Sequence, residues 1–280
     1  MISSFTDRFA RVKIGRLALW SLAGLLIVAV VRVSAPGLSG TTLGLILIYL
    51  VYGLLIAAAF RSCREAHIPI AEVIGPLPKV RDLVSALLLV PLLLFVAMLS
   101  VWLTMYVLSW LAPKLVGSLL AKERSSLVLR NLAPGGSFLF PLGIIVVAPA
   151  VEEFVFRGLL LRRWVARHGL WRGVLWSALA FAILHPQDII GAFVIGVVFA
   201  LLYLATRSLV VPMLAHGLFN GVIALVVFNR DRLGPSADVP NSTIAQFQSE
   251  WGAPVIMLIV FSALLAAAVR PLVIRVTTTP

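Results

Sequence analysis

Residues 138–161 read FLFPLGIIVVAPAVEEFVFRGLLL, an apolar stretch long enough to cross a bilayer, with Glu152 and Glu153 in its interior. One carboxylate at the centre of a spanning helix costs about 2.5–3.5 kcal/mol, and two adjacent carboxylates also repel each other. Arg157 follows Glu153 by one helical turn and shares its helix face, so its guanidinium can hold the Glu153 carboxylate ionised. Since ionisable groups at membrane depth are candidates for function by default, this stretch predicts a polar site inside a spanning helix.

The composition of the whole chain indicates a polytopic membrane protein of the all-α class. Of its 280 residues, 61% are hydrophobic and 12% are charged, and the apolar residues come in long blocks. The net charge of +12 arises from Lys and Arg at the ends of these blocks, a pattern typical of membrane topology rather than nucleic-acid binding. The single cysteine, Cys63, excludes an intramolecular disulfide and a CxxC metal site.

Eight apolar blocks predict a transmembrane helical bundle of about eight spans, at residues 17–33, 42–60, 83–111, 138–161, 173–185, 189–206, 209–228 and 254–269. We divide the chain into N-terminal spans followed by an amphipathic surface helix within the basic segment 113–137 (residues 1–137), a core of four spans (138–228), and a polar loop with a C-terminal span (229–280). With the N-terminus in the cytoplasm, roughly two-thirds of the 23 Lys and Arg residues fall on the cytoplasmic side. This bias predicts an integral membrane protein with both termini in the cytoplasm.

Three polar side chains of the core lie at similar depth in different spans. Counted from the nearest basic residue at the cytoplasmic end, Glu152, His185 and His216 lie roughly 15, 20 and 14 Å into the membrane, at about 1.5 Å rise per residue. Asn220 follows His216 by one helical turn and shares its face. We therefore expect a carboxylate and two imidazoles to converge on one pocket.

Glutamate and histidine together can activate water for hydrolysis, since both can accept a proton, and an Asn amide with a second His can stabilise an oxyanion. The expected reaction is hydrolysis of a peptide bond within the membrane. The same groups could instead ligate zinc, although the chain has no His-Glu-x-x-His motif. We treat metal-free hydrolysis as the main expectation and a zinc-dependent protease as the alternative.

Three motifs resemble, in their order on successive spans, the CPBP family (CAAX protease and bacteriocin-processing, also called Abi), which includes the Ras-converting CAAX prenyl endopeptidases. They are Glu152-Glu153-x-x-x-Arg157, Phe181-x-x-x-His185 and His216-x-x-x-Asn220. The resemblance covers about residues 147–222. The stretch from His185 to His216 is compact and leaves little room for the extra elements of eukaryotic members. This implies a prokaryotic-type protein of an inner or plasma membrane and argues against a prenylated substrate.

The resemblance implies a glutamate-type intramembrane protease that acts on peptides or membrane-tethered proteins from the cytoplasmic side. It assigns water activation to Glu152 with help from His185, support of the site to Glu153 and Arg157, and an oxyanion hole to His216 and Asn220. Two other readings of the buried polar groups remain. One is a non-enzymatic membrane protein such as an immunity factor or scaffold. The other is a proton-coupled transporter, which would have an internal symmetry that this sequence lacks.

Overall fold

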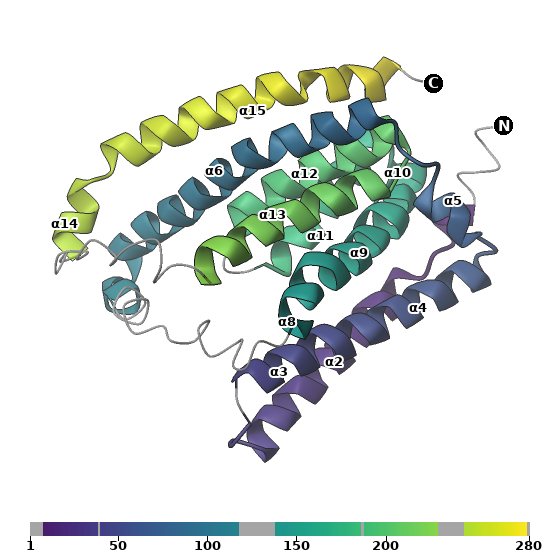
Figure 1. Cartoon of the computed structure of the whole chain (residues 1–280), viewed down its shortest axis with the longest axis horizontal. Coiled ribbons are helices and arrows are strands. Elements are labelled where there is room, and N and C mark those ends of the chain that lie inside the picture. The colour runs from purple at the N-terminus through teal and green to yellow at the C-terminus, as the bar shows by residue number, and fades with distance from the viewer. Residues whose placement is uncertain (1–7, 39, 118–137, 186–187, 229–243, 279–280) are drawn as a thin grey trace.

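The computed structural model describes residues 8–38, 40–117, 138–185, 188–228 and 244–278. Within these ranges the chain forms helices and no strand, which confirms the predicted all-α class (Figure 1). The predicted surface helix of segment 113–137 lies almost entirely outside the described residues, as does most of the predicted polar loop.

The N-terminal helices form a pair on one flank of the molecule (Figure 1). Their backbones come close at Gly24, where a Cβ atom would lie 3.4 Å from Cα of Val51. The second member of the pair contains a π-helical turn, which widens the helix immediately before Tyr52. The elements are α2 (Ile14–Ser34), α3 (Gly40–Ile46), the π-helix η1 (Leu47–Val51) and α4 (Tyr52–Glu65).

Two long helices form the opposite flank, where α15 (Gly252–Thr278) lies along α6 (Val80–Leu111) (Figure 1). Helix α6 remains helical through Pro91. A short helix, α14 (Ile244–Ser249), occupies the end of the predicted polar loop. Its Gln248 side chain donates to the Ser109 carbonyl oxygen at 3.2 Å, so this part of the loop is a helix held against α6.

The helix that carries the two glutamates runs without a break from Leu139 to His168, past the predicted end at residue 161. The apolar part of this helix is followed by a basic, amphipathic turn that is also helical. A prediction from the apolar pattern alone therefore ends the span before the helix ends. Glu152 therefore lies in the middle of a long helix and not at the end of a span. The helix consists of α8 (Leu139–Leu142), the π-helix η4 (Gly143–Val147), α9 (Ala148–Glu153), the π-helix η5 (Phe154–Leu161) and α10 (Arg162–His168).

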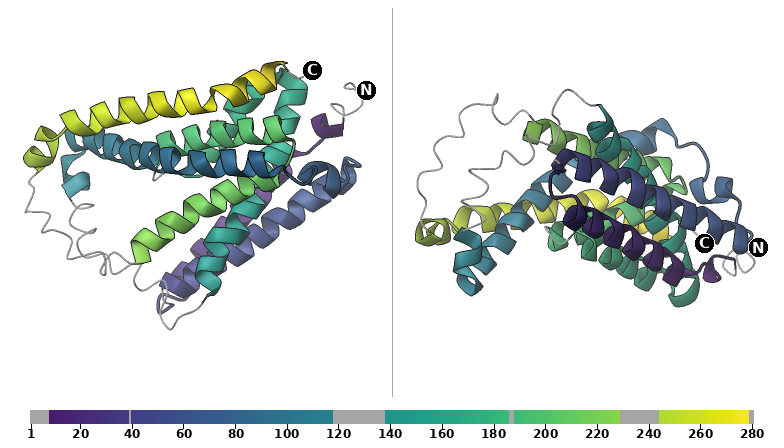
Figure 2. Two further views of the ribbon diagram at one scale, coloured as in Figure 1. Left: turned by 45° about the horizontal axis from the view of Figure 1, so that its top comes forward. Right: turned by 90° about the horizontal axis from the view of Figure 1, so that it is seen from below.

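Three further helices complete the core beside this one: α11 (Leu170–Ile183), α12 (Ile189–Thr206) and α13 (Val210–Phe228). Helices α11 and α12 pack with their backbones in contact, because a Cβ atom on Gly196 would lie 2.8 Å from Cα of Ala178. Figure 1 shows α11, α12 and α13 between the α6–α15 flank and the helix of the glutamates. In the left view of Figure 2, α13 (bright green) runs between α6 (blue) and the helix of the glutamates (teal).

Among the described residues, six helices are long and apolar enough to cross a membrane, and the shorter apolar helices Leu170–Ile183 and Val210–Val226 match the two remaining predicted blocks. In the most apolar stretch of α12, 56% of the residues are buried inside the protein, compared with 11% in the corresponding stretches of α2 and α15. Because α2 and α15 expose their apolar side chains, they have the surface of helices that face lipid, and α12 belongs to the protein core.

Several partly exposed ion pairs lie together at one end of the bundle. Arg8 pairs with Glu72 at 3.1 Å, and Arg275 pairs with Asp82 at 3.0 Å. At the same end, α5 (Ile70–Ile74) approaches the α12–α13 turn so closely that a Cβ atom on Gly75 would lie 1.8 Å from the Arg207 carbonyl oxygen. Gly75 also has a φ of 76°, so this position requires glycine.

Candidate active site

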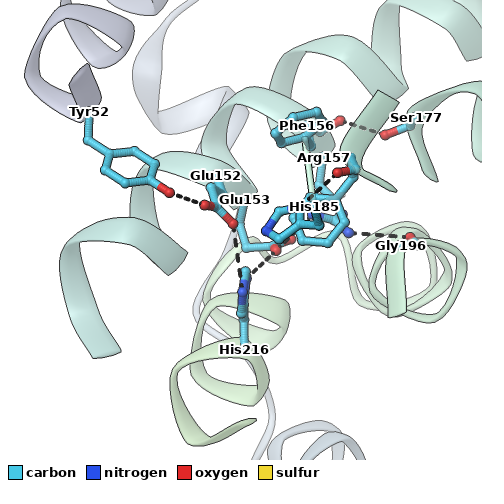
Figure 3. A network of polar contacts seen from close by, with 10 residues as sticks. Tyr52, Glu152, Glu153, Phe156, Arg157, Ser177, His185, Gly196 and His216 are labelled. Carbon is cyan, nitrogen blue, oxygen red and sulfur yellow. Dashed lines mark hydrogen bonds and ion pairs between the residues drawn. The ribbon is translucent and has the colours of Figure 1, made fainter. Parts of the chain in front are cut away.

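The long helix that carries the two glutamates, Leu139–His168, is called the site helix below. The glutamates lie where it changes from α-helical to π-helical winding. Glu152 and Glu153 are the last residues of α9, and η5 begins at Phe154. A π-helical turn displaces the side chains that follow it relative to an α-helix, and such turns are frequent at functional sites. Ser177 of α11 donates to the Phe156 carbonyl oxygen at 3.0 Å and so ties this segment to the neighbouring helix (Figure 3).

Glu153 and Arg157 form a fully buried ion pair, as their spacing predicted. Arg157 Nη1 donates to Glu153 Oε1 at 2.8 Å, and both side chains have 0% of their surface exposed. Arg157 Nη2 also reaches the Gly196 carbonyl oxygen of α12 at 3.4 Å. A buried charge of this kind is tolerated only with its partner, so the pair fixes both side chains.

Three aromatic rings enclose the Arg157 guanidinium. Its Cζ lies 4.6 Å from the ring centre of Phe181, 5.5 Å from that of Phe199 and 5.9 Å from that of Phe156. Aromatic faces attract a cation most strongly when water is excluded. The rings come from α11, α12 and η5, so the guanidinium holds three helices at one point.

His216 of α13 contacts both glutamates (Figure 3). Its Nδ1 lies 2.9 Å from Glu153 Oε1, and its Nε2 lies 3.7 Å from Glu152 Oε2. Since a carboxylate oxygen only accepts hydrogen bonds, we place a proton on Nδ1, which leaves Nε2 directed at Glu152. Glu153 therefore orients the imidazole, while Glu152 stands on its other side.

Glu152 is held from the opposite side by Tyr52 of α4, whose hydroxyl donates to Glu152 Oε1 (Figure 3). Glu152 is 7% exposed and carries no ion pair with Lys or Arg among the described residues. It is thus the one of the two carboxylates that is not neutralised by an adjacent guanidinium.

The second histidine lies beside this cluster without bonding to either glutamate within the described residues. His185 Nδ1 is 2.8 Å from the Phe181 carbonyl oxygen, and its ring centre is 4.3 Å from that of Phe181. The Phe181 ring is also 5.9 Å from the ring of His216. The Phe181 ring therefore contacts both imidazoles.

Asn220 lies one turn beyond His216 and bonds to the site helix. Its Nδ2 donates to the Ile144 carbonyl oxygen of η4 at 2.9 Å, which uses one of the two amide N–H groups. Gly217 allows α13 to lie close to η4, since a Cβ atom at this position would lie only 2.7 Å from the Ile145 carbonyl oxygen. The contact between α13 and η4 positions His216 against the glutamates.

Tyr52 and Phe199 are site residues that the sequence analysis missed. The depth argument could have found Tyr52: it precedes Arg61 by nine residues, about 14 Å along a helix, which is the depth obtained for His216. Phe199 carries no such signal, since a phenylalanine in an apolar span is a packing residue by default. No cluster of three or more His, Cys, Asp or Glu side chains placed to hold a metal ion occurs in the described part of the chain.

A comparison with protein families gives a match in the second half of the chain. The model of the family described as "Type II CAAX prenyl endopeptidase Rce1-like" matches residues 134–222, about a third of the chain. Neither the curated proteins nor the solved structures contain a significant match. The matched segment contains Glu152, Glu153, Arg157, His185, His216 and Asn220. Over residues 134–222, this integral membrane protein is therefore similar to the Rce1-like family of type II CAAX prenyl endopeptidases.

Proposed function

We propose that this protein is an intramembrane endopeptidase in which Glu152 activates a water molecule to hydrolyse a peptide bond. The observation that carries the proposal is the contact of His216 with both buried glutamates. The 3.7 Å between His216 Nε2 and Glu152 Oε2 is longer than a hydrogen bond, so the two atoms do not bond directly and each can bond to a water molecule or a substrate.

In the proposed reaction, Glu152 takes a proton from water as the oxygen attacks the carbonyl carbon of the substrate. The C–N bond of the resulting tetrahedral intermediate breaks as the proton passes to the leaving amine, which yields a carboxylate and an amine. His216 donates from Nε2 when it is protonated and can stabilise the oxyanion. The second N–H group of Asn220 is a further donor for the same charge.

His185 has a separate place in this scheme. Its Nδ1 is engaged by the Phe181 carbonyl oxygen, which leaves Nε2 as the atom that can assist a bound substrate or the water. We assign it a helping role beside Glu152, and Glu153 with Arg157 the role of holding His216 in place.

A cleavage assay tests this proposal with purified protein in lipid nanodiscs and a library of membrane-tethered peptides. We expect the wild type to cleave and to keep its kcat in the presence of a chelator, since the proposed reaction uses no metal. Loss of activity in chelator, restored by zinc, would replace the proposal with the zinc-dependent alternative. The absence of any cleavage would favour a scaffold or immunity protein.

We further propose that the end of the bundle rich in ion pairs faces the cytoplasm, so that substrates arrive from that side. Support comes from the exposed basic residues at this end, among them Lys79, Arg81 and Arg207, because Lys and Arg are retained on the cytoplasmic side. A reporter fused after residue 280 should be active in its cytoplasmic form, such as a fluorescent protein, and inactive as an exported phosphatase. The reverse pattern would contradict this orientation.

A further inference from the structure

The N-terminal helix pair lies outside the family core, yet it reaches the centre of the site. Tyr52 is the first residue of α4, directly after the π-helix η1, and its hydroxyl donates to Glu152 Oε1 across 100 residues of sequence (Figure 3). The matched family segment begins at residue 134, so this contact joins a part of the chain that the family match does not include.

The two oxygens of Glu152 have different neighbours. Oε1 accepts from Tyr52, whereas Oε2 faces His216 Nε2 at 3.7 Å. A carboxylate that is free to rotate about its last bond presents either oxygen to the water. The Tyr52 hydroxyl removes that freedom, because a hydrogen bond to an ionised acceptor is about twice as strong as one between neutral groups.

Two further contacts, one on each side of Tyr52, join its helix to the helix of the glutamates. One turn before it, the Tyr49 hydroxyl donates to the Leu139 carbonyl oxygen at 2.7 Å. Two turns after it, the Phe60 ring packs edge-on against Phe154, with ring centres 5.4 Å apart. The continuous helix formed by η1 and α4 therefore contacts the helix of the glutamates at three levels, and Tyr52 is the middle one.

From this geometry we propose that Tyr52 is a positioning residue of the active site, which fixes the Glu152 carboxylate with Oε2 toward His216. The inference rests on the proposed hydrolytic function. Its consequence is that the N-terminal helix pair is a part of the catalytic unit, since the family core alone lacks the donor to Glu152 Oε1.

Tyr52→Phe removes only the hydroxyl, and Tyr49→Phe is a matched control on the same helix. Tyr49 also donates to the site helix, but to a backbone carbonyl instead of the carboxylate. We expect Tyr52→Phe to lower kcat roughly 10- to 100-fold with KM unchanged, the range for loss of one hydrogen bond to a charged group. Tyr49→Phe should keep kcat within about twofold of wild type, because its bond does not touch the reacting groups.

A double-mutant cycle based on thermal unfolding midpoints tests the same contact and does not require catalytic activity. Tyr52→Phe should lower the unfolding midpoint in the wild-type background and leave it unchanged in the Glu152→Ala background, where the acceptor is gone. Three results would overturn the positioning role. Tyr52→Phe could keep the wild-type kcat, Tyr52→Phe and Tyr49→Phe could lose the same share of kcat, or the changes in unfolding midpoint of Tyr52→Phe and Glu152→Ala could be additive. If the cycle shows coupling and the wild type cleaves nothing, the contact stands and the proposed function fails.

Discussion

Glu152→Gln is expected to lower kcat/KM for peptide cleavage by about 10²–10⁴-fold, the contribution typical of a general base. Glutamine has nearly the same volume, and its amide oxygen can still accept from Tyr52, so the fold should be kept. What it loses is the ability to take a proton from water. The measurement is steady-state cleavage in nanodiscs beside the thermal midpoint of each variant, which should agree with wild type.

Glu65→Gln is the matched control for this variant. Glu65 is a partly exposed glutamate at the ion-paired end of α4, where it contacts Arg16 at 2.6 Å and Arg61 at 3.2 Å. Water screens ion pairs of this kind, so they contribute little to stability and cleavage should be unchanged. Full cleavage by Glu152→Gln would exclude Glu152 as the base. A comparison of His216→Ala with His185→Ala then shows which imidazole the reaction depends on, and we expect the larger loss for His216.

Arg157→Met is expected to cost about 3–5 kcal/mol of unfolding free energy, the range for removing one partner of a buried ion pair. Methionine fills much of the same volume among Phe156, Phe181 and Phe199, but it leaves the Glu153 carboxylate without its cation. His216 would then be the one remaining partner of Glu153 Oε1 in the described structure. A denaturant titration in mixed micelles, followed by tryptophan fluorescence, measures the loss.

The double variant Glu153→Gln/Arg157→Met separates charge from packing. It removes the unpaired carboxylate as well as the cation, so it should regain stability relative to Arg157→Met alone. If the double variant is as unstable as the single one, the loss arises from the aromatic enclosure of the guanidinium and the ion-pair explanation is wrong.

The sequence was sufficient for the fold class and for the pair of charges at its centre. Long apolar blocks specify spanning helices because backbone groups in lipid must bond within their own segment. The spacing of Glu153 and Arg157 specifies their contact because both lie on one helix, so no tertiary information is needed. His216, which the depth argument grouped with Glu152, contacts both glutamates.

The contacts between helices required the structure. Depth does not define the direction in which a side chain points around its helix axis, and the π-helical turns next to the site shift that direction further. For this reason the sequence analysis grouped His185 with Glu152, whereas the Phe181 ring lies beside His185 and no bond joins it to either carboxylate in the described residues. Tyr52 was overlooked because an isolated tyrosine in an apolar span has no motif around it.

The spacing of Glu153 and Arg157 also has a consequence for biogenesis. Their opposite charges are four residues apart on one helix, so the bond between them can form as soon as that helix winds. The segment can then leave the translocon carrying one neutral dipole in place of two bare charges, each of which would otherwise oppose insertion. The countercharge is already present before the ribosome has synthesised the helices that later surround it.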